Sequence, residues 1–436
     1  MFNNILKFTQ DKTKYLYENS LFLSHIDKLI FLTIIAVYLS STFAGSDFIG
    51  FIALITIFLT GIKLLTKSGE KVTCKGFELF ILAYFMLVIV SLFGSTLFYL
   101  SLKGFFKTLT YVGFYASLVI YLKDHKKQIP LMLGLVGVCL SFESFVGFLQ
   151  NFAHVDEIST WQDVSSLNPE EVMTRVYGTL KPYNPNLLGG YFVVGIPALF
   201  GMCALNLYEK RLKCALVWLV LSAAACGTLF ATGCRGSYLA LVGMLLVTFL
   251  ISAKFLWKTY KKIYLSIIAG CSALVLFTLT FISSLRARVF SIFAMRNDSS
   301  NSFRFNVYHS SLDMFKDNWL LGIGIGNQNF REIYGLYMRT GFDALSAYNI
   351  FLETAVESGI FALIAFVGFL ICLFVQGVKC ILKSTDVKNI IFVSTAIVSV
   401  VGVCIHGMVD TVFFRPQIQF VFWLMIAISS VIVNEK

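Results

Sequence analysis

Charged residues are scarce in this chain, at 14% of its 436 residues. Soluble domains contain about 25% charged residues and about 45–50% apolar residues. Here the apolar share is 57%, so the composition excludes an ordinary soluble domain. The formal net charge is +11, but the basic residues stand in short groups between apolar runs rather than in one patch. We therefore expect no nucleic-acid binding.

Metal-ligand patterns are also lacking. The ten cysteines include no Cys-x-x-Cys pair, and the five histidines do not group at metal-ligand spacing. Most of the cysteines fall within apolar runs, where a free thiol packs as a small hydrophobic group. We expect no disulfide framework, no metal site and no cofactor. Residues 1–28 carry charges throughout, so they predict no cleavable signal peptide.

Apolar runs of about 20 residues recur along almost the whole chain, and each is long enough to cross a bilayer as a helix. Lipid offers the backbone no hydrogen-bond partners, so such runs must be helical. We predict an all-α, polytopic membrane protein with about 12 transmembrane helices, and residues 1–436 form a single integral membrane domain. The predicted spans are 29–45, 48–66, 77–95, 105–122, 129–152, 187–207, 212–231, 236–253, 262–284, 359–378, 389–408 and 417–433.

The connections between these spans alternate in charge. One set is rich in lysine, in the segments 63–75, 123–127, 210–213, 254–262 and 379–388. The positive-inside rule places this set in the cytoplasm together with both termini.

All arginines except Arg211 fall on the predicted outer side, against that rule. A guanidinium grips phosphate or carboxylate with a planar fork, so this bias predicts an anion-handling site on the outer face. Two long outer connections carry most of these arginines. The first, 153–186, holds Trp161 and Arg175. The second, 285–358, is predicted to be a large, mostly helical extracytoplasmic loop that includes Arg296.

Apolar spacing within the second connection predicts a short helix over 302–316. Residues 345–358 predict an amphipathic helix at the membrane surface. Glu353 and Glu357 stand one turn apart there and indicate its polar face or a carboxylate pair. The GxGxG run within 321–327 has no βαβ context and indicates a flexible turn.

Several charged residues at span ends allow two interpretations. Arg235 is either a side chain snorkelling to the interface or a guanidinium aimed at an outer anion. Arg286 and Arg288 directly follow a span and either anchor it to headgroups or bind substrate. Arg415 and Asp410 form either a structural pair or a pair that lines the substrate site.

Glu143 lies deepest in an apolar run. Intramembrane carboxylates are commonly proton carriers or hydrogen-bonded partners of a neighbouring helix, and both interpretations stay open. Lys107 is the nearest candidate for an opposite charge.

Four motifs carry a resemblance: RVYGTL with NPNLLG (175–189), CRGSYLAL (234–241), FRFNVY with MFKDNWLLGIGIGN (303–327), and YNIFLETAVESG (348–359). Together they resemble the O-antigen ligase and polymerase superfamily of bacterial inner-membrane proteins. Three further segments are most similar to the subgroup labelled as bicarbonate transporters, first noticed in cyanobacteria. These are RVFSIF with DSSNSFR (288–304), ALSAY (344–348) and HGMVDTVFFRP (406–416). The resemblance covers 175–425, the O-antigen ligase-related region.

The resemblance implies a multi-pass protein of the inner (plasma) membrane with a C-type glycosyltransferase-like helix bundle. It implies metal-independent transfer of a glycan from a polyprenyl diphosphate carrier to an acceptor hydroxyl. Arg235 and Arg304 would neutralise the departing diphosphate. The family's catalytic histidine is Tyr348 in this chain, and tyrosine, with a pKa near 10, is a poor base at neutral pH.

Twelve residues are therefore candidate site residues. The catalytic candidates are Arg235, Arg304 and Tyr348; the substrate-binding candidates are Arg175, Asn186, Arg286, Arg288, Asn349, Glu353, His406, Asp410 and Arg415. The expected partners are a polyprenyl diphosphate-linked glycan or a small anion, and membrane lipid. Two alternatives stay open: a bicarbonate or small-anion transporter or accessory protein of inorganic-carbon uptake, and a catalytically silent relative that binds lipid-linked sugar.

Overall fold

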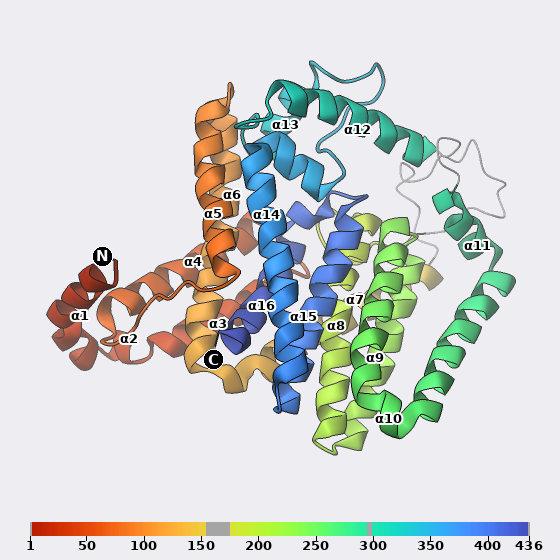
Figure 1. Ribbon diagram of the computed structural model, residues 1–436, viewed down its shortest axis with the longest axis horizontal. Helices are drawn as coiled ribbons and strands as arrows, with labels where there is room; N and C mark the ends of the chain where they lie inside the picture. The colour runs from red at the N-terminus through yellow and green to blue at the C-terminus, as the bar shows by residue number, and fades with distance from the viewer. Residues whose placement is uncertain (1, 154–174, 294–298, 435–436) are drawn as a thin grey trace.

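A computed structural model describes residues 2–153, 175–293 and 299–434, and these residues contain helices but no strand. Trp161 and Arg296 lie outside the described residues. Figure 1 shows most of the long helices side by side, with α11, α12 and α13 gathered at one end. The α-helices are α1 (Phe2–Asn19), α2 (Leu21–Ser24), α3 (Ile26–Ser40), α4 (Ser46–Thr66), α5 (Glu78–Ser91), α6 (Phe98–Asp124), α7 (Ile129–Phe152), α8 (Pro185–Tyr208), α9 (Leu212–Ala231), α10 (Arg235–Phe281), α11 (Ser283–Phe290), α12 (Ser299–Asp317), α13 (Asn327–Tyr334), α14 (Ile350–Lys383), α15 (Val387–Gly407) and α16 (Pro416–Val433).

The predicted all-α membrane fold is confirmed. Within the described part of the chain, 10 helices are long and apolar enough to cross a membrane. Two predicted spans, 29–45 and 77–95, correspond to the shorter helices α3 and α5. Both are apolar helices just below the length of the other ten, so the predicted number of about 12 spans is not contradicted.

The helices α8, α15 and α16 form the centre of the bundle. Almost every residue of α16 is buried, including Phe420 and Phe422, and α8 packs on both α9 and α15. Lipid is as apolar as these side chains, so close packing and interhelical hydrogen bonds hold such helices together. The hydroxyl of Ser399 on α15 donates to the carbonyl of Val194 on α8 at 2.7 Å. These central helices bring their polar ends together at one face.

That face is called the loop face below. It is formed by the first residues of α4, α8, α10 and α16, the end of α15, and the helices α11 to α13. The opposite end holds the lysine-rich connections, and there Lys388 at the start of α15 pairs with Glu209 at the end of α8 at 2.6 Å. The positive-inside assignment of this end to the cytoplasm stays a prediction.

The long helix α10 consists of two arms joined at Tyr260, whose φ of −124° and ψ of 30° break the helix. Figure 1 shows the second arm returning toward α11 at the edge of the bundle. The Tyr264 hydroxyl donates to the carbonyl of Phe249 at 2.6 Å and so ties the arms near the bend. The separate spans 236–253 and 262–284 predicted from the sequence match these two arms.

The predicted surface helix over 345–358 was wrong. Helix α14 begins at Ile350 and runs through a kink at Gly359 into the membrane span, and its first turns are buried within the protein. Val356 packs in an apolar cluster with Val307 of α12 and Phe330 of α13. The amphipathic pattern predicted that the polar face of this segment is exposed to water. Helices α12 and α13 cover that face instead.

The glycine run after α12 lies against the main chain of α14. The amides of Ile323 and Gly324 donate to the carbonyls of Val356 and Glu357, each at 2.9 Å. Gly322 has a φ of +74°, and a Cβ there would lie 2.4 Å from the carbonyl group of Glu357. Only glycine combines this conformation with such a close approach. The predicted flexible turn is therefore a close contact that fixes where α13 begins.

We expect Gly322→Ala to destabilise the protein by about 1–3 kcal/mol, because the new Cβ meets main chain and the backbone is left-handed. Gly227→Ala is the control, since Gly227 is helical and a Cβ there meets nothing within 4 Å. Thermal unfolding of both variants in the same detergent checks this. Equal unfolding temperatures for the two would contradict the close contact.

Candidate functional site

A cavity of about 850 Å³ opens at the loop face. Its walls come from the starts of α4 and α16, the first half of α6, the segment before α8, and α13. The uncharged polar side chains in its wall include Asn184, Asn186, Asn327, Gln328 and Thr411. Pockets of this size can enclose a drug-sized molecule.

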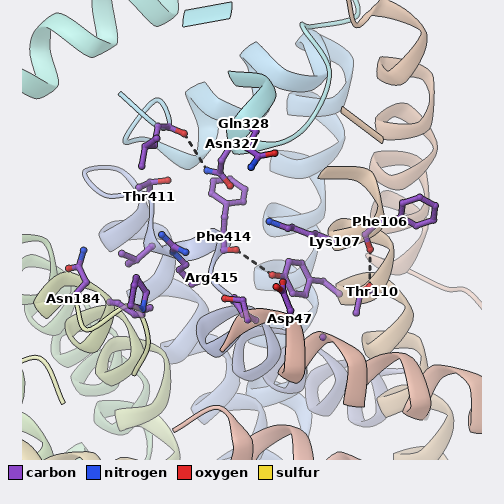
Figure 2. A pocket seen from close by; sticks show the side chains of 18 of the residues that line it. Asp47, Phe106, Lys107, Thr110, Asn184, Asn327, Gln328, Thr411, Phe414 and Arg415 are labelled. Carbon is purple, nitrogen blue, oxygen red and sulfur yellow. Dashed lines mark hydrogen bonds between the residues drawn. The ribbon is translucent and has the colours of Figure 1, made fainter. Parts of the chain in front are cut away.

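Cationic side chains face this cavity. Figure 2 shows Lys107 reaching from α6 toward the side where Phe414 and Arg415 lie. Arg331 also lines the cavity and forms an ion pair with Asp343 at 2.7 Å. Lys107 and Arg415 are exposed, so both can meet a ligand that enters.

Next to the cavity, Arg175 begins a chain of hydrogen bonds that ends in a buried carboxylate. Its Nε donates to the carbonyl of Thr232 at 2.7 Å, and a terminal nitrogen donates to Asn186 Oδ1 at 2.5 Å. Asn186 Nδ2 in turn donates to Asp410 Oδ2 at 2.9 Å. Asp410 is only 2% exposed and lines the cavity. This chain joins the start of α8 to the loop between α15 and α16.

Arg304 approaches the same carboxylate from α12. One terminal nitrogen lies 4.0 Å from Asp410 Oδ2, and Nε donates to the carbonyl of Val409 at 2.8 Å. Arg235, the first residue of α10, is 9% exposed and donates to the carbonyl and hydroxyl of Ser291. Both predicted catalytic arginines therefore lie at the loop face, on segments that meet around Asp410 and the end of α15.

Arg288 completes the group, and its Nε donates to the carbonyl of Gly233 at 2.9 Å. Burial lowers the pKa of Arg288 to about 10, with further lowering by the charges of Arg175 and Arg235. Burial also lowers the pKa of Arg175. Each guanidinium stays protonated at neutral pH. These like charges would repel one another, so an anion that enters among them gains attraction from several groups at once. Arg175, Arg235, Arg288 and Arg304 are called the arginine cluster below.

Two side chains of α7 hold the segment that carries Arg175. Gln150 Oε1 accepts hydrogen bonds from the amides of Tyr177 and Gly178 at 3.0 and 2.9 Å. Glu143 Oε2 accepts from the amide of Thr179 at 2.9 Å, and its other oxygen accepts from the Thr179 hydroxyl. Of the two interpretations of Glu143, the structure supports a hydrogen-bonded partner. Lys107, its candidate counter-charge, faces the cavity instead.

Tyr348 lines the cavity in a strained conformation, with a φ of 51°. A bulky residue rarely adopts this left-handed region, and such outliers collect at functional sites. Asn349 caps α14 by accepting from the amides of Phe351 and Leu352, each at 3.0 Å. Burial raises the pKa of Tyr348, and the charge of Asp410 raises it further. Tyr348 is therefore even less suited to act as a base than a free tyrosine.

Three other predicted site residues, Arg286, Glu353 and His406, do not line the cavity. Arg286 is exposed, and it donates to the carbonyl of Thr280 away from the cavity. Glu353 is 1% exposed, buried behind the loop before α14 rather than on a polar face. His406 is also buried, and its Nε2 lies 3.4 Å from the sulfur of Cys234.

The predicted pair of Arg415 and Asp410 does not form among the described ion pairs. Arg304 is instead the arginine that faces Asp410. Asp410 turns back to accept from the amides of Thr411 and Val412 at 2.7 and 3.1 Å, while Arg415 is exposed to the cavity. The prediction rested on the short spacing between Asp410 and Arg415 in the sequence, which does not reveal that the chain turns between them.

Sequence reasoning missed the polar residues that α6 and α13 bring to the cavity. Lys107 lies on a helix with little amphipathic pattern, so only the fold shows which way it points. Asn327 and Gln328 follow the glycine run directly, and their place depends on the contact of that run with α14. The sequence contains one signal for this arrangement: the third glycine of the run, Gly326, directly precedes the start of helix α13.

Comparison with known protein families gives a match to part of the chain. Residues 218–367 match a family model described as O-antigen ligase. The match includes Arg235, Arg304 and Tyr348, and it supports the resemblance to the O-antigen ligase superfamily. It does not confirm the bicarbonate transporter subgroup, which stays a prediction. No curated protein sequence matches the chain significantly.

The sidedness of the site can be tested by thiol labelling. Arg415→Cys, in a background with its exposed cysteines replaced, is expected to react with an impermeant maleimide added outside intact cells. The matched control lacks Arg415→Cys and retains native Cys74, exposed in the lysine-rich connection before α5, as its exposed cysteine; it is expected to react only after permeabilisation. Labelling of Cys74 but not of residue 415 in intact cells would show that the predicted topology is inverted.

Proposed function

We propose that this protein transfers a glycan from a polyprenyl diphosphate carrier to an acceptor hydroxyl at the outer face of the inner membrane. The observation that carries the proposal is the arginine cluster beside a cavity of about 850 Å³ at the loop face. The match to the O-antigen ligase family model supports the reaction class. The cluster lies at the ends of helices that are long and apolar enough to span a membrane, where the diphosphate of a lipid-linked donor is expected.

Arg235 and Arg304 act on the leaving group. As the bond from the anomeric carbon to the diphosphate oxygen breaks, negative charge grows on that oxygen. Fixed guanidinium groups in a partly buried site stabilise this charge without reorganising at the moment of reaction. The planar fork of each side chain can hold two phosphate oxygens at once.

The acceptor occupies the cavity. Its hydroxyl oxygen bonds to the anomeric carbon, and its proton passes to the released diphosphate. The hydroxyl of Tyr348 and the amides of Asn327 and Gln328 orient the acceptor by hydrogen bonds. Tyr348 does not serve as the base, because its raised pKa keeps it protonated.

Transport of a small anion is the second candidate. Exposed Lys107 and Arg415 would attract bicarbonate to the cavity. A cavity of about 850 Å³ is much larger than such an ion, however, and it favours a bulky substrate. Uptake of labelled bicarbonate by proteoliposomes would favour transport over glycan transfer.

Arg304→Lys is expected to lower the transfer rate by about 100-fold, because a lysine keeps the charge but loses the fork. Arg286→Lys makes the same chemical change at an exposed arginine and is expected to leave the rate unchanged. Transfer is measured in nanodiscs with a polyprenyl diphosphate-linked oligosaccharide extracted from the same membranes. If the two variants behave alike, Arg304 has no role at the diphosphate.

Tyr348→Phe removes only the hydroxyl, and we expect it to slow transfer by about 10-fold, the size of one lost hydrogen bond. The shape of the pH–rate profile should not change, since Tyr348 does not titrate in the working range. Loss of a limb of the profile, together with a far larger drop in rate, would show that Tyr348 is the base after all.

A further inference from the structure

Three side chains that sequence spacing did not connect meet at the end of α15. Cys234 Sγ lies 3.4 Å from His406 Nε2, and one donor atom from each of Cys234, His406 and Asp410 lies within 4.8 Å of the others. The three residues are 3%, 3% and 2% exposed. This is a closed group of a thiol, an imidazole and a carboxylate at the loop face.

The fold fixes the imidazole between two helices. A Cβ at Gly236 of α10 would lie 3.2 Å from His406 Cδ2, and a Cβ at Gly190 of α8 would lie 3.4 Å from its Cε1. The imidazole ring of His406 therefore packs closely between Gly190 and Gly236. Cys234 is the residue before α10, so its sulfur is held at the helix start.

We propose that Cys234, His406 and Asp410 bind a divalent transition metal of the zinc class. A thiolate at about 2.3 Å and an imidazole nitrogen at about 2.0–2.1 Å from a tetrahedral zinc ion stand roughly 3.6 Å apart. The observed separation of these two atoms is 3.4 Å. Magnesium and calcium prefer sets made of oxygen ligands, so the sulfur and nitrogen donors select a softer metal.

The carboxylate is already oriented for this role. Asp410 Oδ1 accepts from the amides of Thr411 and Val412, Oδ2 accepts from Asn186 Nδ2, and Arg304 lies beyond hydrogen-bond distance, 4.0 Å from Oδ2. An ionised carboxylate has about four acceptor positions, so these three bonds leave room for a metal. Metal ligands are commonly held by such outer hydrogen bonds, which fix the angle of approach.

The ligand set also balances the charge of a divalent ion. A thiolate and a carboxylate supply two negative charges, and a neutral imidazole supplies the third ligand. Arg175 and Arg288 donate to the main-chain carbonyls of Thr232 and Gly233, both beside this group. A metal held by Cys234, His406 and Asp410 would fix the start of α10, and with it Arg235, against the end of α15. The site does not depend on the proposed glycan transfer.

Metal content of the wild-type protein tests the proposal directly. Protein in nanodiscs is loaded with Zn²⁺ alone, dialysed against metal-free buffer, and measured by mass spectrometry of the metal. We expect one tightly bound zinc ion per chain. In Co²⁺-loaded protein we expect the intense visible bands of a tetrahedral site and a thiolate-to-cobalt charge-transfer band. Wild-type protein that retains no metal and shows no such bands would overturn the proposal.

Variants then assign the ligands. Cys234→Ser and His406→Gln are expected to lose the metal and the charge-transfer band. Cys404→Ser is the matched control, because Cys404 is a free cysteine on α15 close to His406 and is expected to leave metal binding unchanged. Asn186→Ala removes a hydrogen bond to Asp410, together with the one that Asn186 accepts from Arg175, and should weaken zinc binding by about 10–100-fold. Unchanged zinc affinity in Cys234→Ser and His406→Gln would show that the metal is held elsewhere, which also overturns the proposal.

Discussion

The loop face is organised around one buried carboxylate, that of Asp410, whose negative charge needs hydrogen-bond donors and positive charges nearby. Asp410 is nearly inaccessible, yet it accepts hydrogen bonds from two amides of its own loop and from Asn186 of α8, and Arg304 of α12 faces it. A buried charge without such partners costs several kcal/mol, so these segments gain stability by meeting there. Arg175 joins through Asn186, which brings a second guanidinium to the same place. Two members of the arginine cluster, Arg175 and Arg304, are thus linked to one negative group.

The membrane confines this polar group to helix ends. Charges deep in lipid are expensive, and the charged groups of this face lie at helix ends: Arg235 is the first residue of α10, and Asp410 and Arg415 lie between α15 and α16. The contact of the glycine run with α14 then places α13 over the cavity. Close main-chain contact and charge compensation together form a site from segments far apart in the sequence.

Much of the fold was predictable because membrane spans leave a simple signal. Apolar runs gave the helical class and the approximate positions of the spans, and arginine sidedness predicted a site at one end. The segment from Ile350 was assigned to the surface, because a single sequence does not show that α12 covers it. The contact between Arg304 and Asp410 depends on a turn of the chain, and no periodic pattern in the sequence predicts that turn. Lys107 shows the same limit, since the direction in which an isolated lysine points is set by its neighbours in space.

The central claim is that an anion headgroup binds among the arginine cluster, beside the cavity. A cryo-electron microscopy map of the protein purified in native lipid tests this most directly. The account predicts density of a diphosphate between Arg235 and Arg304, with an attached chain leading into the membrane. A map with Arg235 and Arg304 on separate surfaces, or with the headgroup density at the lysine-rich end, would contradict it.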